Sequence, residues 1–338
     1  MGAAIRRLLA VFALVAISGC SDGPTAPTAP ADQFDQLWAT FDREYSYFVL
    51  KGVDWNALRA QYRPRAAAAA TQDALVAVIR EMLGQLRDVH VRLISPSGTT
   101  LPTYTPTALQ NFDQPLWLQV VTAGGWTQAR LNLGYATLRG IPYIAIGSWN
   151  PSQFSADDLD QVLERIRSAP AIIVDVRPNG GGDDQLALRF AARFASRSAV
   201  TEYIQFRNGP AHSDFGTEVV RTVSPGGAWQ FTKPVIVLSG RGVYSSNESF
   251  IAAMREQAHI TIVGDTTGGG TANPGTHDLG LGWKYTVSRW IARTADRVPI
   301  EGRGIPPNVY VAWDPAVRAM GRDPVIEAAL TMLGAPPP

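Results

Sequence analysis

The 338-residue chain contains little cysteine and lysine and little excess charge, and each scarcity limits what the protein can be. Its only cysteine, Cys20, excludes a disulfide bond within the chain. The 30 basic and 29 acidic residues leave a net charge of +1, which argues against a nucleic acid partner. Lysine occurs only at positions 51, 233 and 284. No Cys/His or carboxylate spacing suggests a metal site, and we expect no cofactor.

Long apolar runs are also scarce, and the one at the N-terminus is typical of an export signal. Two arginines precede the run from Leu8 to Ile17, and Ser18-Gly19-Cys20 closes it. The run is too short to cross a bilayer as a mature helix. Small residues before the cysteine resemble a bacterial lipobox, although a buried or incidental cysteine is the alternative. We therefore expect a signal peptide over 1–19 and a lipid-anchored, Pro-rich tether over 20–33.

This pattern places the mature protein in the cell envelope, at the periplasmic face of the outer membrane. The lipid on Cys20 would be its only contact with the membrane. The oligomeric state stays open.

Residues 34–87 are predicted to form a small helical bundle. Aromatic and aliphatic residues from Phe34 to Phe48 recur at steps of three and four, as on one face of a helix. Asp54 is a candidate N-cap for a second helix that ends around Pro64, and Thr71 opens a third. The aromatic stripe indicates packing rather than a ligand site.

From residue 136 onward, strand-like and helix-like segments alternate, which predicts an α/β domain. Buried strands are expected at 171–176, 235–238 and 260–263, with helices from Ser155, from about Asp184 and after Ser245. Strands separated by helices imply right-handed crossovers and a mostly parallel sheet. We assign residues 88–338 to this core domain, while 95–135 give no clear pattern.

Two turns of this domain carry candidate chemistry. Ser245 and Ser246 lie where a buried strand gives way to a helix, beside backbone N–H groups without intrahelical partners. The two serines are candidate nucleophiles, or they merely cap the helix. The Gly180–Gly182 run lacks the residues of a phosphate loop, and it fits either an oxyanion-binding turn or a simple tight turn. His90 is either structural or catalytic.

Several ordered segments together resemble the family of tricorn-core and C-terminal-processing serine peptidases. The segments are Leu86-x-Asp88-x-His90, Val174-Asp175-Val176-Arg177-x-Asn179-Gly180-Gly181-Gly182, Ser245-Ser246-Asn247-Glu248, Val263-Gly264-Asp265-Thr266-Thr267-Gly268-Gly269-Gly270 and Glu301-Gly302-x-Gly304-Ile305-x-Pro307. The resemblance covers about residues 34–320. It implies a ClpP/crotonase-like α/β core, preceded by the helical bundle, and a peptide or protein substrate.

The resemblance also implies a role for each matching residue. Ser245, three residues before the motif glutamate, is the nucleophile, and the backbone N–H groups of Ser246 and Gly181 hold the oxyanion. The choice among the three glycines stays open, with Gly181 favoured. His90 matches the base of the tricorn-like branch, and Glu301 matches the glutamate that helps to orient it.

The sequence departs from the family pattern at three places. The C-terminal-processing branch places a lysine base where this chain has Gly270, so a serine–lysine dyad is not supported. The tricorn-like branch has a serine immediately before its histidine, where this chain has Val89, so a hydroxyl that could support the base is missing. The interval 95–135 is also too short for the PDZ domain that members commonly carry.

We expect a lipid-anchored serine peptidase that works through an acyl-enzyme. The main alternative is a non-catalytic protein that binds a lipid or a peptide on the same fold. A less favoured alternative is an acyl-CoA enzyme on a crotonase-like core, which would need no serine nucleophile.

Overall fold

The computed structural model describes residues 28–337, so Cys20 and the predicted signal peptide lie outside the described residues. The helices are α1(Pro30–Glu44), α2(Phe48–Lys51), α3(Trp55–Ala67), α4(Gln72–Gly84), α5(Gln114–Ala123), α6(Ala156–Arg165), α7(Asp184–Ala191), α8(Ser246–Arg255), α9(Pro315–Ala319) and α10(Pro324–Met332). The strands are β1(Arg92–Ile94), β2(Thr100–Pro102), β3(Thr127–Arg130), β4(Leu133–Leu138), β5(Ile141–Ile146), β6(Ile172–Asp175), β7(Ala199–Phe206), β8(Val219–Val223), β9(Val235–Ser239), β10(Ile260–Gly264), β11(Gly275–Gly280), β12(Trp283–Val287), β13(Trp290–Thr294) and β14(Val309–Tyr310).

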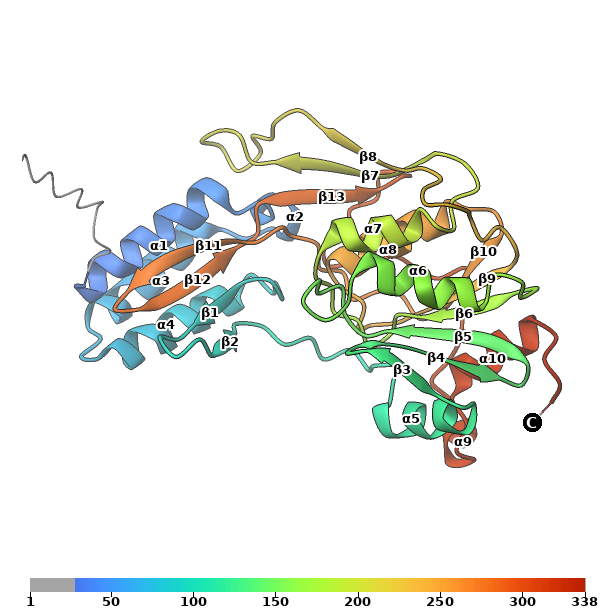
Figure 1. The fold of residues 1–338 in the computed structure, drawn as a ribbon. Coiled ribbons are helices and arrows are strands. Elements are labelled where there is room, and N and C mark those ends of the chain that lie inside the picture. The colour runs from blue at the N-terminus through green and yellow to red at the C-terminus, as the bar shows by residue number, and fades with distance from the viewer. Residues whose placement is uncertain (1–27, 338) are drawn as a thin grey trace, which may run out of the picture.

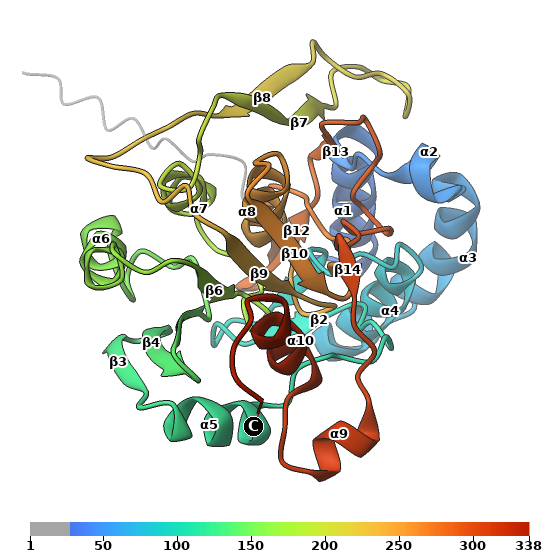
Figure 2. The same ribbon diagram turned by 90° about the vertical axis from the view of Figure 1, so that its right-hand side faces the viewer.

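A seven-stranded sheet forms the centre of the larger unit, in the order β14-β10-β9-β6-β5-β4-β3. The pairs from β5 through β6, β9 and β10 to β14 are parallel, and β3, β4 and β5 pair antiparallel. Helices α6, α7 and α8 cover one face, whereas α5 and α10 cover the other (Figures 1 and 2). The predicted mostly parallel α/β core is therefore confirmed.

The central strands are apolar throughout because both of their faces are covered. In β6, Ile172 and Val174 face the cluster that contains α7 and α8, whereas Ile173 faces the cluster that contains α10. The same alternation continues in β9, where Val237 and Leu238 point to opposite faces. This packing fixes the carboxyl end of each strand, where the glycine turns and the serine turn begin.

The N-terminal helices pack against a second, four-stranded sheet in the order β11-β12-β1-β2 (Figure 1). Leu93 of β1 pairs with Tyr285 of β12, and both are buried with the aromatic residues of α1 and α3. Strands from the segment after residue 88 thus complete the helical unit. A third sheet, β13-β7-β8, lies beside α8.

Two local predictions about this helical unit were wrong. Helix α1 begins at Pro30, inside the segment predicted as tether, because a proline in the first turn of a helix costs no hydrogen bond. Helix α3 continues through Pro64 to Ala67. Pro64 lies in the last turn, where the missing N–H removes one bond while its own carbonyl still accepts from Ala68.

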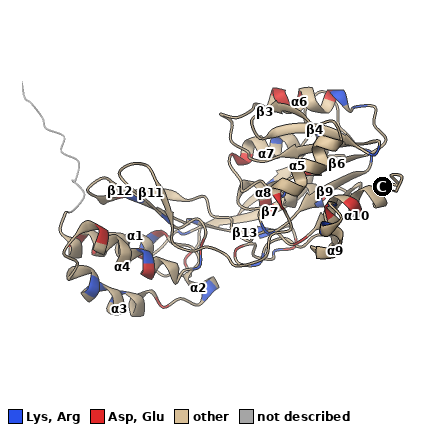
Figure 3. Ribbon diagram, turned by 90° about the horizontal axis from the view of Figure 1, so that it is seen from below, with Lys and Arg blue, Asp and Glu red and all other residues tan. Residues whose placement is uncertain are grey.

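Acidic and basic residues are interspersed along the helices of both units (Figure 3). Within residues 28–337, none of the helices is long and apolar enough to cross a membrane.

Candidate active site

Ser245 adopts an unusual backbone conformation at the turn from β9 to α8. Its φ is 58° and its ψ is −132°, a region that a residue with a side chain occupies at a cost of about 1–3 kcal/mol. Its N–H donates to the carbonyl oxygen of Gly270 at 2.7 Å. Although Ser245 occupies the N-cap position, its side chain accepts no hydrogen bond from the N–H groups of the first helical turn. The simple capping interpretation of this serine is therefore wrong.

The neighbouring serine offers a backbone donor. Ser246 is the first residue of α8, and its N–H makes no hydrogen bond to another described residue. Its side-chain hydroxyl is buried and also has no partner within residues 28–337. An unbonded N–H at a helix N-terminus is available to a developing negative charge.

The Gly180–Gly182 turn lies directly against Ser245. A Cβ at Gly181 would lie 2.8 Å from Ser245 Cβ and 3.4 Å from its Oγ, and the φ of Gly181 is 115°. Only glycine fits there, for steric and conformational reasons. The structure thus brings Gly181 and Ser245 together, as the resemblance implies.

The N–H of Gly181 is nevertheless already engaged, since it donates to Asn179 Oδ1 at 2.8 Å. Gly182 lies against Trp149 and lines the same cavity as Ser245, and its N–H makes no bond within the described part of the chain. In this conformation Gly182, unlike Gly181, keeps an N–H that no described residue occupies.

Asn247 fixes this turn relative to α8. Its side-chain amide donates to the carbonyl oxygens of Val176 and Asn179, at 3.0 and 2.8 Å, and its Oδ1 accepts from Trp149 Nε1 at 2.9 Å. The backbone N–H of Trp149 in turn donates to Gly181 O at 2.9 Å. The candidate nucleophile and the candidate oxyanion turn are therefore held by one buried network.

His90 is buried, and its backbone is held on both sides. Its N–H donates to Asp88 Oδ1 at 2.8 Å, and its carbonyl oxygen accepts from Thr286 Oγ1 at 2.5 Å. Burial lowers the pKa of the imidazole, and the negative charge of Asp88 opposes that effect. The ring is therefore favoured in its neutral form, which a general base requires. Its Nδ1 has no hydrogen-bond partner within residues 28–337.

Gly270 connects His90 with Ser245. Its carbonyl oxygen accepts the Ser245 N–H, while a Cβ at this position would lie 3.5 Å from His90 Cε1 and 2.7 Å from Val89 Cγ2. Val89, and to a lesser extent Tyr244 at 3.2 Å, thus crowd the space that a side chain at 270 would enter, whereas His90 would be in ordinary contact with it. Among residues 28–337, no hydrogen bond links the imidazole to the Ser245 hydroxyl.

Glu301 lies in a different arrangement from the one that the resemblance implies. Its Oε1 accepts from Lys51 Nζ at 2.5 Å, and no hydrogen bond joins it to His90 within the described residues. Burial raises its pKa well above the usual value, the charges of Asp88 and Glu248 add to the rise, and Lys51 opposes it. Its Oε2 is buried without a partner among residues 28–337. The predicted orienting contact is therefore absent because Lys51 holds the carboxylate.

Two buried carboxylates were not assigned roles from the sequence. Asp88 accepts from the His90 N–H and from Ser288 Oγ at 2.7 Å. Glu248 accepts from the N–H groups of Gly269 and Gly270, both at 2.9 Å, and from Thr267 Oγ1 at 2.5 Å. Both residues lie inside the quoted motifs, but the contacts that give them a role come from distant segments.

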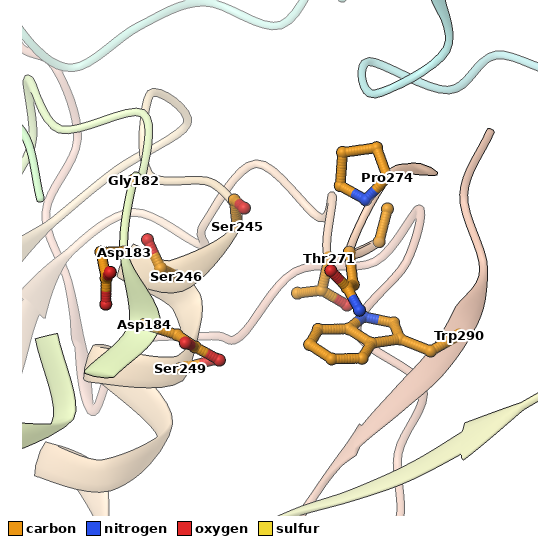
Figure 4. Close-up of a pocket in the computed structure, with 11 residues that line it drawn as sticks. Gly182, Asp183, Asp184, Ser245, Ser246, Ser249, Thr271, Pro274 and Trp290 are labelled. Carbon is orange, nitrogen blue, oxygen red and sulfur yellow. The ribbon is translucent and has the colours of Figure 1, made fainter. Parts of the chain in front are cut away.

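A cavity of about 280 Å³ opens beside Ser245 (Figure 4). Ser245 and Ser246 lie on one side of it, and Thr271, Pro274 and Trp290 lie on the other. Asp184 also lines it and pairs with Arg221 at 2.5 Å. This volume can receive a side chain of a peptide whose carbonyl carbon faces Ser245.

Clusters of three or more histidine, cysteine, aspartate or glutamate residues that could hold a metal ion do not occur between residues 28 and 337.

Sequence comparison identifies two families along the chain. The profile of "Peptidase family S41" matches residues 140–311, just over half of the chain, and that of "Tricorn protease C1 domain" matches residues 27–84. The carboxy-terminal processing protease CtpA of Bacillus subtilis (strain 168) is 29% identical over 162 residues. That match covers 47% of this chain and 32% of CtpA, so the chain spans about a third of the length of that relative.

Solved structures extend the likeness over nearly the whole chain. A protein from Parabacteroides merdae ATCC 43184, named provisionally as a peptidase, superimposes with a TM-score of 0.82 and 30% identity, covering 91% of this chain and 97% of that one. The photosystem II D1 C-terminal processing protease has a TM-score of 0.55 and 16% identity, covering 88% and 99% of the two chains. The latter likeness concerns the fold alone.

Proposed function

Because the chain belongs to peptidase family S41, a family of serine peptidases, we propose that it hydrolyses peptide bonds through an acyl-enzyme on Ser245. The position of Gly270 next to both Ser245 and His90 carries this proposal. Its carbonyl oxygen accepts the Ser245 N–H and a Cβ at 270 would lie 3.5 Å from His90 Cε1, which supports a serine nucleophile near a histidine base.

In the proposed reaction, Ser245 Oγ attacks the scissile carbonyl carbon while His90 takes the hydroxyl proton. His90 then gives that proton to the leaving amine, and water releases the acyl group by the same route in reverse. The Ser246 N–H and an N–H of the Gly180–Gly182 turn would stabilise the oxyanion. Each such donor contributes on the order of 10²–10³-fold to the rate.

Glu301 remains our candidate for orienting His90. Its Oε2 and the imidazole Nδ1 are both buried without hydrogen-bond partners among the described residues. A carboxylate oxygen accepts hydrogen bonds, and a protonated Nδ1 can donate one. Lys51 pairs with Glu301 and opposes the rise in its pKa that burial causes, while Asp88 fixes the histidine backbone.

Covalent labelling tests the proposal directly. The full-length protein is treated with a fluorophosphonate, and the intact mass is measured beside the Ser245→Ala and Ser246→Ala variants. We expect one adduct in the native protein, none in Ser245→Ala and one in Ser246→Ala, since the Ser246 hydroxyl has no partner to lose within the described chain. A well-folded native sample without an adduct would instead favour the ligand-binding alternative.

We also propose that Cys20 carries a lipid and anchors the protein to the cell envelope, facing the periplasm. Three features of the N-terminus support this assignment: the two arginines, the short apolar run that follows them, and the small residues before the cysteine. A Cys20→Ala variant should lose labelling by a fatty-acid probe and leave the membrane fraction. Labelling that persists in this variant would disprove the assignment.

A further inference from the structure

The short helix α2 of the N-terminal unit reaches the candidate active site with one charged side chain. Lys51 is its last residue, and the ammonium group donates to Glu301 Oε1 at 2.5 Å and to the carbonyl oxygens of Leu86 and Arg87, both at 3.1 Å. The Lys51 side chain is 11% exposed and that of Glu301 is 2% exposed, so the pair lies almost entirely out of water. All three hydrogens of the ammonium group are therefore used.

The two carbonyl groups belong to the turn that leads to His90. Helix α4 ends at Gly84, and Arg87 adopts a φ of 47°, a left-handed conformation that is costly for a residue with a side chain. Such a conformation persists only where the surroundings hold it. The next residue, Asp88, accepts the His90 N–H. Lys51 thus binds the turn immediately before the residue that holds the histidine backbone.

The same helical turn also contacts the segment behind Ser245. Tyr47 immediately precedes α2, and its hydroxyl donates to the carbonyl oxygen of Thr271, the neighbour of Gly270. The carbonyl oxygen of Gly270 in turn accepts the Ser245 N–H. The Lys51 N–H donates to the carbonyl oxygen of Tyr47 at 2.9 Å, and its ammonium group lies 5.2 Å from the centre of the tyrosine ring. One turn of helix therefore joins the segments that carry the candidate nucleophile, base and orienting carboxylate.

We propose that Lys51 and Tyr47 are positioning residues that align the candidate catalytic groups, and that the N-terminal helical unit serves catalysis through them. Lys51 binds Oε1 of Glu301, whose Oε2 has no partner among residues 28–337 and is left to Nδ1 of His90. A cation also favours the ionised carboxylate, the form that accepts a hydrogen bond from the imidazole. This inference rests on the proposed function and names the element that assembles its site.

Another lysine of the chain offers a matched control. The ammonium group of Lys233 also donates to three backbone carbonyl oxygens, at 3.4, 3.1 and 2.8 Å, and lies 5.7 Å from the centre of the Phe231 ring. Among the described residues, each of its hydrogen-bond partners is a carbonyl group. Lys233 is exposed and precedes β9, at the end of that strand opposite Ser245. Lys233→Met therefore removes similar contacts at a distance from the candidate site.

The rate at which a fluorophosphonate labels Ser245 tests the proposal and requires no known substrate. We expect Lys51→Met to slow labelling at neutral pH at least about 10-fold, since a displacement of about 1 Å in an active site can cost about 100-fold. Lys233→Met should label at the native rate. Lys51→Arg keeps the charge and the donors, and Lys51 lines a cavity of about 520 Å³ in which a larger group has room, so this variant should recover most of the rate.

The pH profile of labelling distinguishes positioning from a purely structural role. The positive charge of Lys51 lowers the pKa of His90 and opposes the rise in the pKa of Glu301. Without that charge both pKa values rise, so a neutral imidazole and an ionised carboxylate coexist only at higher pH. The pH of half-maximal labelling should therefore move upward in Lys51→Met and stay in place in Lys51→Arg. The other titratable or charged groups that act on these two residues are unchanged in both variants: Asp88, Arg92, Glu248, Tyr45 and Tyr47.

A native labelling rate in Lys51→Met would overturn the inference, as would a slow rate with an unshifted pH profile or one that Lys51→Arg does not restore. Urea unfolding shows whether each variant is folded. Should Lys51→Met fail to fold, Tyr47→Phe decides, because it removes only the hydroxyl that binds Thr271. Slower labelling of that variant at a native pH midpoint supports the inference, and a native rate overturns it. The proposed function fails separately, when the native protein itself takes no adduct on Ser245.

Discussion

Replacing Glu248 by glutamine should change how the stability of the protein depends on pH. The carboxyl group is fully buried, and burial raises its pKa from 4.5 to about 7, even though Thr267, Gly270 and Gly269 donate hydrogen bonds that favour the charged form. The folded protein therefore retains a proton at Glu248 that the unfolded chain loses first. Since the folded state binds more protons, its free energy of unfolding falls as the pH rises from 4.5 to about 7.

The size of this effect follows from the difference between the two pKa values, about 7 minus 4.5. At 1.36 kcal/mol per pKa unit, the contribution of Glu248 to stability decreases by about 3 kcal/mol across this window. Glutamine cannot ionise, so the variant lacks the contribution. The stability of the native protein relative to Glu248→Gln should thus be about 3 kcal/mol lower at about pH 8 than at pH 4.5.

Urea unfolding of both proteins at several pH values, at constant ionic strength, measures this difference. Glu256→Gln, at the far end of α8, controls for the general loss of a negative charge on that helix. A native-minus-variant difference that stays constant with pH would refute the reasoning, because it would mean that the hydrogen bonds to Glu248 outweigh its burial.

Three further predictions concern the candidate catalytic residues. His90→Ala should lower kcat at least about 100-fold with little change in the unfolding midpoint. Because burial lowers the pKa of His90, the activity of the native enzyme should fall with decreasing pH only below about 6.5. Gly181→Ala should abolish labelling of Ser245 by a fluorophosphonate, since its Cβ would lie 2.8 Å from Ser245 Cβ, and undiminished labelling would contradict the close approach. Gly270→Ala should destabilise the protein by about 1–3 kcal/mol in urea unfolding. Adding Val89→Ala should restore part of that loss, and no rescue would exclude Val89 as the clashing group.

Local sequence patterns were sufficient to predict the starts of α3, α4, α6, α7 and α8 and the central strands. Asp54, Thr71 and Ser155 each accept an N–H of the first helical turn, as expected of N-caps. The buried strand before Ser245 and the strand at Ile172 were also predicted, because apolar runs between helices leave few alternatives. These features depend on residues within a few positions of one another.

The features that were missed depend on contacts between distant residues. Lys51 and Glu301 are far apart in the chain, and only the folded structure brings the ammonium group to the carboxylate. The strands β11 and β12 complete the helical unit from more than a hundred residues away, so a pattern limited to residues 34–87 could not include them. The engagement of the Gly181 N–H by Asn179 depends on one side-chain rotamer, which composition does not encode.

The crowding around Gly270 has a consequence for how such enzymes can diverge. A Cβ at 270 would lie 2.7 Å from Val89 Cγ2, whereas His90 Cε1, at 3.5 Å, would be in ordinary contact with it. Val89 is therefore the first residue that has to shrink or move before a side chain can be accommodated at 270. An evolutionary exchange of a histidine base for a lysine base would begin at position 89, which belongs to neither base.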